Sequence, residues 1–188
     1  MVLSKLAEEV SNAVVATVKG TDDVLSSLRG AVKNQVTGVF KDVGDMATAG
    51  MDALVDVVHG AVSGAGQLGA SLTAAVKGTV SSSLSAVAEV GGDVISATSI
   101  AAGAAVSAVV DLGGDVAGAA VSAVEGAIEA AESIGVNTTE AASEAVKGVV
   151  KAADSVGSEA GKSVRDALMA AASLPRDIVE RIVRGSEK

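Results

Sequence analysis

The chain has 188 residues and a formal net charge of −9, and 49% of its residues are hydrophobic although only 1% are aromatic. It has no cysteine, which excludes disulfides and thiolate metal sites. Residues 46–135 hold one lysine and nine acidic residues; this balance argues against nucleic acid as a partner, because phosphates are bound by Lys and Arg.

The first part of the chain predicts irregular helical repeats over residues 4–68. Its opening stretch, MVLSKLAEEVSNAVV, has no basic region followed by an apolar core, so we expect no signal peptide and a cytoplasmic protein. Gly20 and Gly44, which lie 24 residues apart (44 − 20), are expected to end helices. Ser4 and Thr21 are expected to cap helix N-termini, because a hydroxyl can accept a free backbone N–H there.

One group of polar side chains in this part could bind a metal ion. Asp52, Asp56 and His59 are spaced i, i+4 and i+7, so a helix would place them on one face. Two carboxylates and an imidazole are suitable ligands for a divalent metal. A solvated polar stripe explains the same spacing, and we favour that interpretation over a metal site.

Residues 69–157 repeat with a period of 22 residues. In each repeat a Val, Leu or Ile precedes a glycine, and a small polar or acidic residue follows, as in EVGGD and DLGGD. Glycine adopts the left-handed conformation that ends many helices, and Ser, Thr and Asp are common N-caps. The repeat glycines are Gly69, Gly91, Gly113, Gly135 and Gly157, and the expected N-caps are Ser71, Asp93, Asp115, Thr138 and Ser158.

This punctuation predicts a single all-α domain over residues 1–188, with eight or nine short antiparallel helices. Each helix should have about 16–20 residues, joined by links of about two to four residues. One continuous helix of 11-residue period is the alternative, but two adjacent glycines inside a helix would cost about 2 kcal/mol. Because Ala, Val and Gly are small, we expect closely spaced helices in a bundle or a helical-repeat array.

The predicted helix over residues 94–112 differs from the others because it has no charged face. The unit after Gly135 has a polar stripe of glutamates, lysines and an aspartate. A helix without a charged face is buried, inserted in lipid or covered by another copy of the protein. The Ala-rich interior of a compact bundle explains the missing charge over residues 94–112 equally well. The positions equivalent to the polar stripe, 44 residues earlier, are Ser96, Ile100, Gly103, Ser107 and Val110.

Residues 94–124 have the form of an apolar helical hairpin closed by DLGGD. In composition this segment resembles the hydrophobic hairpin of pore-forming colicins, a resemblance that implies insertion into lipid. The 22-residue period is similar to that of exchangeable apolipoproteins, whose repeats are punctuated by proline rather than glycine. The longest uncharged run, residues 94–110, is shorter than the roughly 20 residues that cross a bilayer, so we do not predict a transmembrane helix. Membrane association is kept as the alternative function.

Residues 175–188 predict a separate amphipathic helix, for which Pro175 is suited to the first turn. We expect this helix to dock on the rest of the bundle, because Asp177 and Glu180 dilute the basic face that would favour a membrane surface. Its apolar stripe is formed by Ile178, Val179, Ile182 and Val183.

Few residues could carry catalysis. No serine lies in a GxSxG motif, His59 is the one histidine, and GAGQLGAS does not match a phosphate-binding pattern. Glu125, Glu129 and Glu132 form an acidic ladder that could bind Ca²⁺ but is typical of a solvated face. We predict that the protein is not an enzyme and has no cofactor or small-molecule substrate. The expected function is a structural, self-associating subunit of a homo-oligomeric filament, tube, shell or scaffold.

Overall fold

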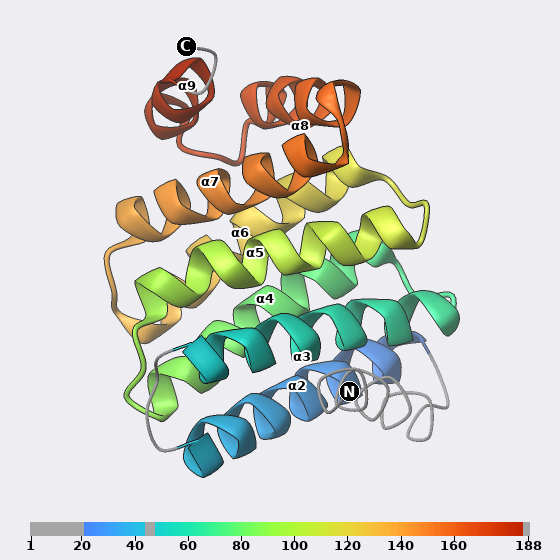
Figure 1. The fold of residues 1–188 in the computed structure, drawn as a ribbon, viewed down its shortest axis with the longest axis vertical. Helices are drawn as coiled ribbons and strands as arrows, with labels where there is room; N and C mark the ends of the chain where they lie inside the picture. The colour runs from blue at the N-terminus through green and yellow to red at the C-terminus, as the bar shows by residue number, and fades with distance from the viewer. Residues whose placement is uncertain (1–20, 44–47, 186–188) are drawn as a thin grey trace.

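The computed structural model describes residues 21–43 and 48–185, and this part of the chain is all α-helical, with eight helices and no strand (Figure 1). The predicted fold class is therefore confirmed, although the helices have 10 to 23 residues, a wider range than expected. The predictions for Ser4, Gly20 and Gly44 lie outside the described residues. The helices are α2 (Thr21–Val43), α3 (Thr48–Gln67), α4 (Leu72–Glu89), α5 (Val94–Asp111), α6 (Val116–Ile134), α7 (Thr138–Val156), α8 (Ser158–Ala170) and α9 (Arg176–Gly185).

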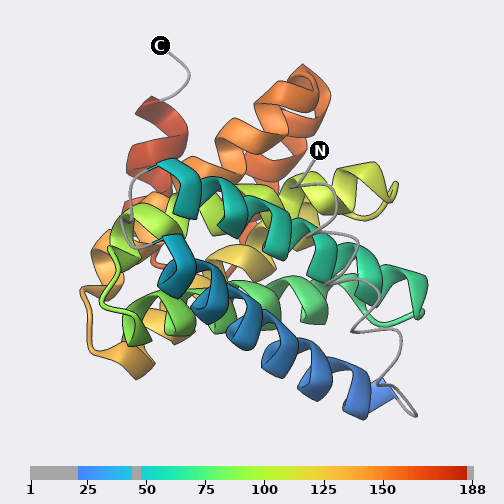
Figure 2. The ribbon, with the colours of Figure 1, turned by 60° about the horizontal axis from the view of Figure 1, so that its bottom comes forward.

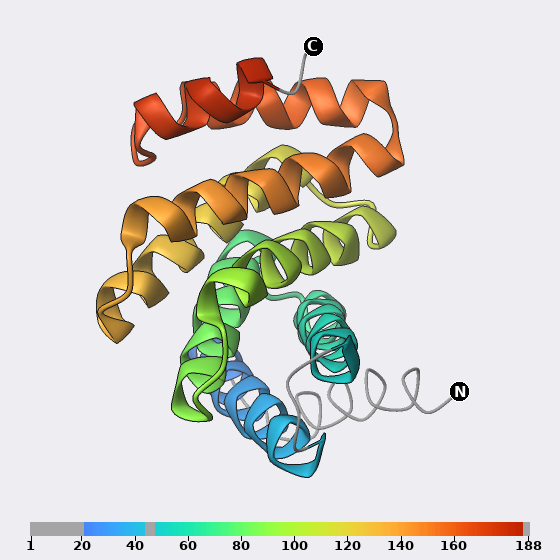
Figure 3. The same cartoon turned by 60° about the vertical axis from the view of Figure 1, so that its left-hand side comes forward.

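The helices are stacked in two layers. One layer holds α2, α4, α6 and α8 and the other holds α3, α5, α7 and α9, and in Figure 1 α3, α5 and α7 lie in front of α4 and α6. The most extensive contacts join helices two apart in the chain, above all α5 with α7 and α4 with α6. Consecutive helices run antiparallel and lie in alternate layers. The structural repeat is therefore a pair of helices, one from each layer, and it corresponds to two periods of the sequence. Figure 2 views the stack from the α2 end, and Figure 3 shows its succession from α2 to α9.

The repeat glycines stand where the chain reverses direction. Their φ angles are 71° at Gly69, 77° at Gly91, 66° at Gly113, 83° at Gly135 and 153° at Gly157. Within the described residues these five are the only ones with positive φ. A side chain is strained in that conformation, so glycine at these positions allows each helix to end and the next to begin.

Side-chain capping follows the prediction at three junctions and departs from it at two. At the α6–α7 link the prediction of Thr138 was wrong, because Asn137 is the N-cap and its side-chain oxygen accepts two backbone N–H groups at 3.0 and 3.2 Å. The prediction of Ser158 was also wrong, because the single residue Gly157 joins α7 to α8 and caps without a side-chain bond. The confirmed N-caps are Ser71, Asp93 and Asp115.

Two glycines let helices of the same layer meet backbone to backbone. A Cβ on Gly126 of α6 would lie 2.5 Å from the carbonyl oxygen of Lys77 in α4. A Cβ on Gly148 of α7 would overlap the carbonyl oxygen of Ser99 in α5. Both contacts span 49 residues (126 − 77 and 148 − 99), so the two layers stack in the same register. The close helix spacing expected from small side chains is thus present.

The core is made almost entirely of Ala, Val and a few Leu side chains. Among the described residues three buried ones are polar, and of these Thr98 donates its hydroxyl to the Val94 carbonyl at 2.7 Å, within its own helix. At the other end of the stack α9 packs on α7 and α8. The side chains that it buries there are Ile178, Val179 and Val183.

Candidate functional site

The most unusual surface of the molecule lies on α5, the helix without a charged face. α5 contacts α3, α4, α6 and α7, and ten of its residues are buried. The other helices of the chain therefore bury the surface of α5, as expected, except along one stripe that faces outward. Along that stripe Ser96 is exposed and the other residues are half-buried; these are Ile100, Gly103, Ser107 and Val110.

Three residues of this stripe, Ile100, Gly103 and Ser107, line the floor of a shallow groove of about 360 Å³ between α3 and α7. The floor is low because α5 and α7 approach closely: a Cβ on Gly103 would lie 3.2 Å from the carbonyl oxygen of Gly148. Val55, on the α3 side, is one of the few large apolar side chains that the described residues expose, at 38%. We call this surface the groove face; it is lined by Val55, His59, Ser99, Ile100, Gly103, Ala104, Ser107, Gly148, Lys151, Ala152 and Ser155.

Charged side chains lie in or next to both walls of the groove. On α3, exposed Asp52 and half-buried Asp56 lie beside the lining residues, and on α7 exposed Lys151 lines the groove directly. Within the described part of the chain, none of the three forms an ion pair. Lys151 is thus the one charged α7 residue among the lining residues, whereas Asp52 and Asp56 lie next to lining residues along α3 and do not line the groove themselves.

The carboxylate of Asp56 is partly buried and incompletely hydrogen-bonded. Its Oδ2 atom is buried and has no hydrogen-bond partner among the described residues. Burial is the main reason why the pKa of Asp56 is raised above its ordinary value; His59 opposes the shift and Asp52 adds to it. A carboxylate in this position is less well solvated than an exposed one.

The structure uses His59 differently from the metal-binding alternative. His59 Nε2 lies 2.9 Å from Asp111 Oδ2, which belongs to α5 and is 52 residues away in the chain. Asp52 and Asp56 share the α3 surface with His59, but no group of three metal-ligating side chains is close enough to hold an ion in the described ranges. No local pattern pointed to Asp111 as the partner of His59, because the contact depends on how α3 and α5 stack.

Two of the three carboxylates of the acidic ladder on α6, Glu125 and Glu129, face a lysine of the neighbouring helix. Lys77 Nζ of α4 lies 3.9 Å from Glu125 and 3.3 Å from Glu129. Ser173, in the link before α9, donates its hydroxyl to Glu125 at 2.6 Å. Glu125 and Glu129 therefore connect α6 with α4, and Glu125 also connects it with the C-terminal link.

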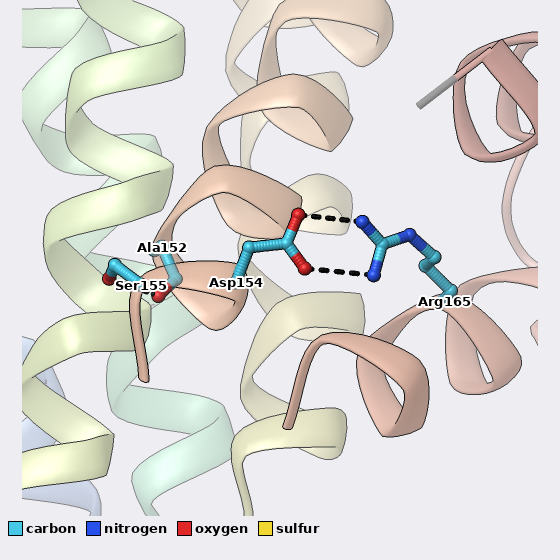
Figure 4. A network of polar contacts seen from close by, with 4 residues as sticks. All are labelled: Ala152, Asp154, Ser155 and Arg165. Carbon is cyan, nitrogen blue, oxygen red and sulfur yellow. Dashed lines mark hydrogen bonds and ion pairs between the residues drawn. The ribbon is translucent and has the colours of Figure 1, made fainter. Parts of the chain in front are cut away.

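An ion pair also joins α8 to α7. Arg165 Nη1 and Nη2 donate to the two carboxylate oxygens of Asp154 at 2.8 and 2.6 Å, so that the guanidinium and carboxylate face each other (Figure 4). Gly161, one turn before Arg165, leaves room for this contact, because a Cβ there would overlap the Asp154 carboxylate. This bidentate pair is structural and lies outside the groove face.

Among the described helices only α5 is long and apolar enough to span a membrane by length and composition, and 56% of that segment is buried within the molecule. Buried core helices of soluble proteins meet the same criterion, so this property alone does not distinguish a membrane helix. No family model matches the chain, and no curated protein matches it.

Proposed function

We propose that the protein is a structural, self-associating subunit whose copies pair through the groove face. The observation that carries this proposal is the open stripe of α5, which is uncharged, lies in a groove and is flanked by exposed Val55. An uncharged helix stripe in the middle of a layer gains free energy when another surface removes it from water. Small side chains on it allow that surface to approach closely.

The C-terminal end of the stack supports pairing through a face rather than end-to-end growth. Helical stacks are closed to further stacking by terminal helices with a polar outer face. On α8 and α9 the exposed side chains are mostly charged; they include Glu159, Lys162, Asp166, Arg176, Asp177, Arg181 and Arg184. An isologous contact through the groove face closes at two copies, whereas a head-to-tail contact would extend into a filament. A dimeric building block is thus the favoured form of the assembly.

Light scattering coupled to size exclusion, over a range of protein concentrations, tests the proposal. The wild-type protein should exceed the monomer mass of 18.1 kDa and approach twice that mass as concentration rises. Ser107→Glu, which places a charge on the groove floor, should shift the protein to monomer. Ser122→Glu is the matched control: Ser122 is also half-buried but lies on α6 in the other layer, so this variant should behave as wild type.

Circular dichroism must show that Ser107→Glu keeps its helical content; if it does not, Ser99→Lys tests the same floor from a neighbouring position. A wild-type protein that stays monomeric at every concentration would contradict the proposal.

Membrane association is the second candidate, and α5 alone favours it, through its length and apolarity. Insertion would require α5 to leave contacts with four neighbouring helices. Liposome flotation tests it: the protein should float with the lipid fraction, and its recovery in the protein fraction at the bottom of the gradient would count against this candidate. The predictions of a cytoplasmic protein without enzymatic activity or nucleic acid partner stay predictions.

A further inference from the structure

A cleft between the last two helices of the stack gathers positive charge. It has a volume of about 330 Å³ and lies between α8 and α9. Of the six described residues that line it, three are basic and one is acidic, in a chain whose formal net charge is −9. These residues are Lys162, Arg165, Asp166, Met169, Val183 and Arg184.

Two of the basic side chains belong to different helices and line the same cleft. Lys162 of α8 and Arg184 of α9 are both exposed, and within the described residues neither forms an ion pair. Asp166, about one helical turn after Lys162, is the acidic lining residue and offsets part of this charge. The cleft keeps an excess of positive charge, which attracts an anion.

The third basic residue, Arg165, brings a buried hydrogen-bond donor to the cleft. Its side chain is only 16% exposed. Both Nη atoms donate to the Asp154 carboxylate of α7, which balances its charge, and Nε lies on the side of the guanidinium away from that carboxylate (Figure 4). Nε is buried and has no hydrogen-bond partner among the described residues. Because buried N–H groups rarely lack an acceptor, this donor favours an acceptor in the adjoining cleft.

The size and the apolar part of the cleft limit what it can hold. Met169 and Val183 are apolar lining residues, so they would replace part of the water around a bound group. Hydrogen bonds between charged groups are stronger where water is excluded. The volume of the cleft lies at the lower end of the range for small-molecule pockets. It therefore suits one small anionic group.

From these observations we infer that the α8–α9 cleft binds an anionic group of the phosphate or carboxylate type. Lys162 and Arg184 are its charged contacts, and Arg165 is a buried donor beside them. This site is separate from the groove face, which lies on α3, α5 and α7. The inference is therefore independent of the proposed self-association and stands or fails without it.

Titration of the full-length protein with inorganic phosphate at constant ionic strength, followed by amide chemical shifts in NMR, tests the site. The wild-type protein should show saturable shifts confined to α8 and α9. Lys162→Gln and Arg184→Gln should each weaken binding roughly tenfold, because each removes a charge-assisted contact. Asp166→Asn removes the acidic lining side chain and should tighten binding about threefold. Arg181→Gln is the matched control, because Arg181 is exposed on α9 but does not line the cleft; it should leave binding unchanged.

Shifts that do not saturate, that spread over the other basic side chains, or that persist in the double variant Lys162→Gln/Arg184→Gln would overturn the inference. Circular dichroism checks that each variant keeps its helical content; because both side chains are exposed, the fold should be retained. Acetate in place of phosphate tests a carboxylate at the same site. Flotation with phosphatidylglycerol vesicles, with and without competing inorganic phosphate, distinguishes a lipid headgroup from a free anion as the source of the bound group.

Discussion

At the scale of single residues, Asp93 shows how the repeat sequence starts a helix. Its carboxylate accepts the backbone N–H of Ser96 at 3.1 Å and the hydroxyl of the same residue at 2.6 Å. The Ser96 hydroxyl is the main reason why the pKa of Asp93 is lowered below its ordinary value, and the backbone N–H adds to the effect. Because the folded protein favours the ionised carboxyl, this stabilisation is present above the unfolded pKa and is lost as pH falls through the folded one.

We therefore expect Asp93→Ala to lower the free energy of unfolding by about 1 kcal/mol at pH 7. The difference from wild type should shrink as the pH falls below 3.8, the ordinary value for Asp. Urea unfolding at several pH values measures this. Ser96→Ala, which removes the hydroxyl but keeps the backbone bond, should cost less than Asp93→Ala. An equal cost of Asp93→Ala at pH 7 and at acid pH would contradict this account of the cap.

The residue-scale features of the fold were the most predictable ones. A glycine with positive φ and an aspartate N-cap are both local, so Gly91, Asp93, Gly113 and Asp115 could be assigned from their spacing alone. Thr138 was assigned wrongly because Asn137, one residue earlier, can also accept N–H groups, and only the backbone geometry decides between them.

At the scale of helices, Gly126 controls how closely α4 and α6 pack. Gly126→Ala would push a methyl group against the Lys77 carbonyl, which belongs to backbone and cannot turn aside. We expect the free energy of unfolding to fall by about 1–3 kcal/mol, because overpacking forces the two helices apart. Chemical denaturation measures the change.

Gly30→Ala is the matched control for this prediction. Gly30 also lies inside a helix, α2, but a Cβ there would have no atom within 4 Å. Alanine should therefore stabilise the protein by up to about 1 kcal/mol through its higher helix propensity. If both variants destabilised the protein equally, close backbone approach would not be the reason for glycine at position 126.

Helix contacts were less predictable than helix ends. Short links indicated that consecutive helices are antiparallel, but not that most helices pack most extensively on the one two places away. The contacts between His59 and Asp111 and between Lys77 and Glu129 follow from that stacking. Because they join residues that are far apart in sequence, no local pattern could reveal them.

At the scale of the whole molecule, the absence of charge on one face of α5 was visible in the sequence, whereas its consequence required the structure. The sequence could not decide whether Ile100, Gly103 and Ser107 would be covered by the same chain. The fold covers α5 with four neighbouring helices and leaves these three residues in a groove between α3 and α7. Self-association through this face is the central claim of our account.

Single-cysteine crosslinking tests that claim most directly, because the chain has no cysteine of its own. Ser107→Cys places a thiol on the groove floor, and Ser122→Cys places one on α6 outside the groove face. Under mild oxidation or with a short bismaleimide, our account predicts a covalent dimer for Ser107→Cys and little or none for Ser122→Cys. Equal crosslinking of both variants, or none for Ser107→Cys at concentrations where the protein is dimeric, would contradict it.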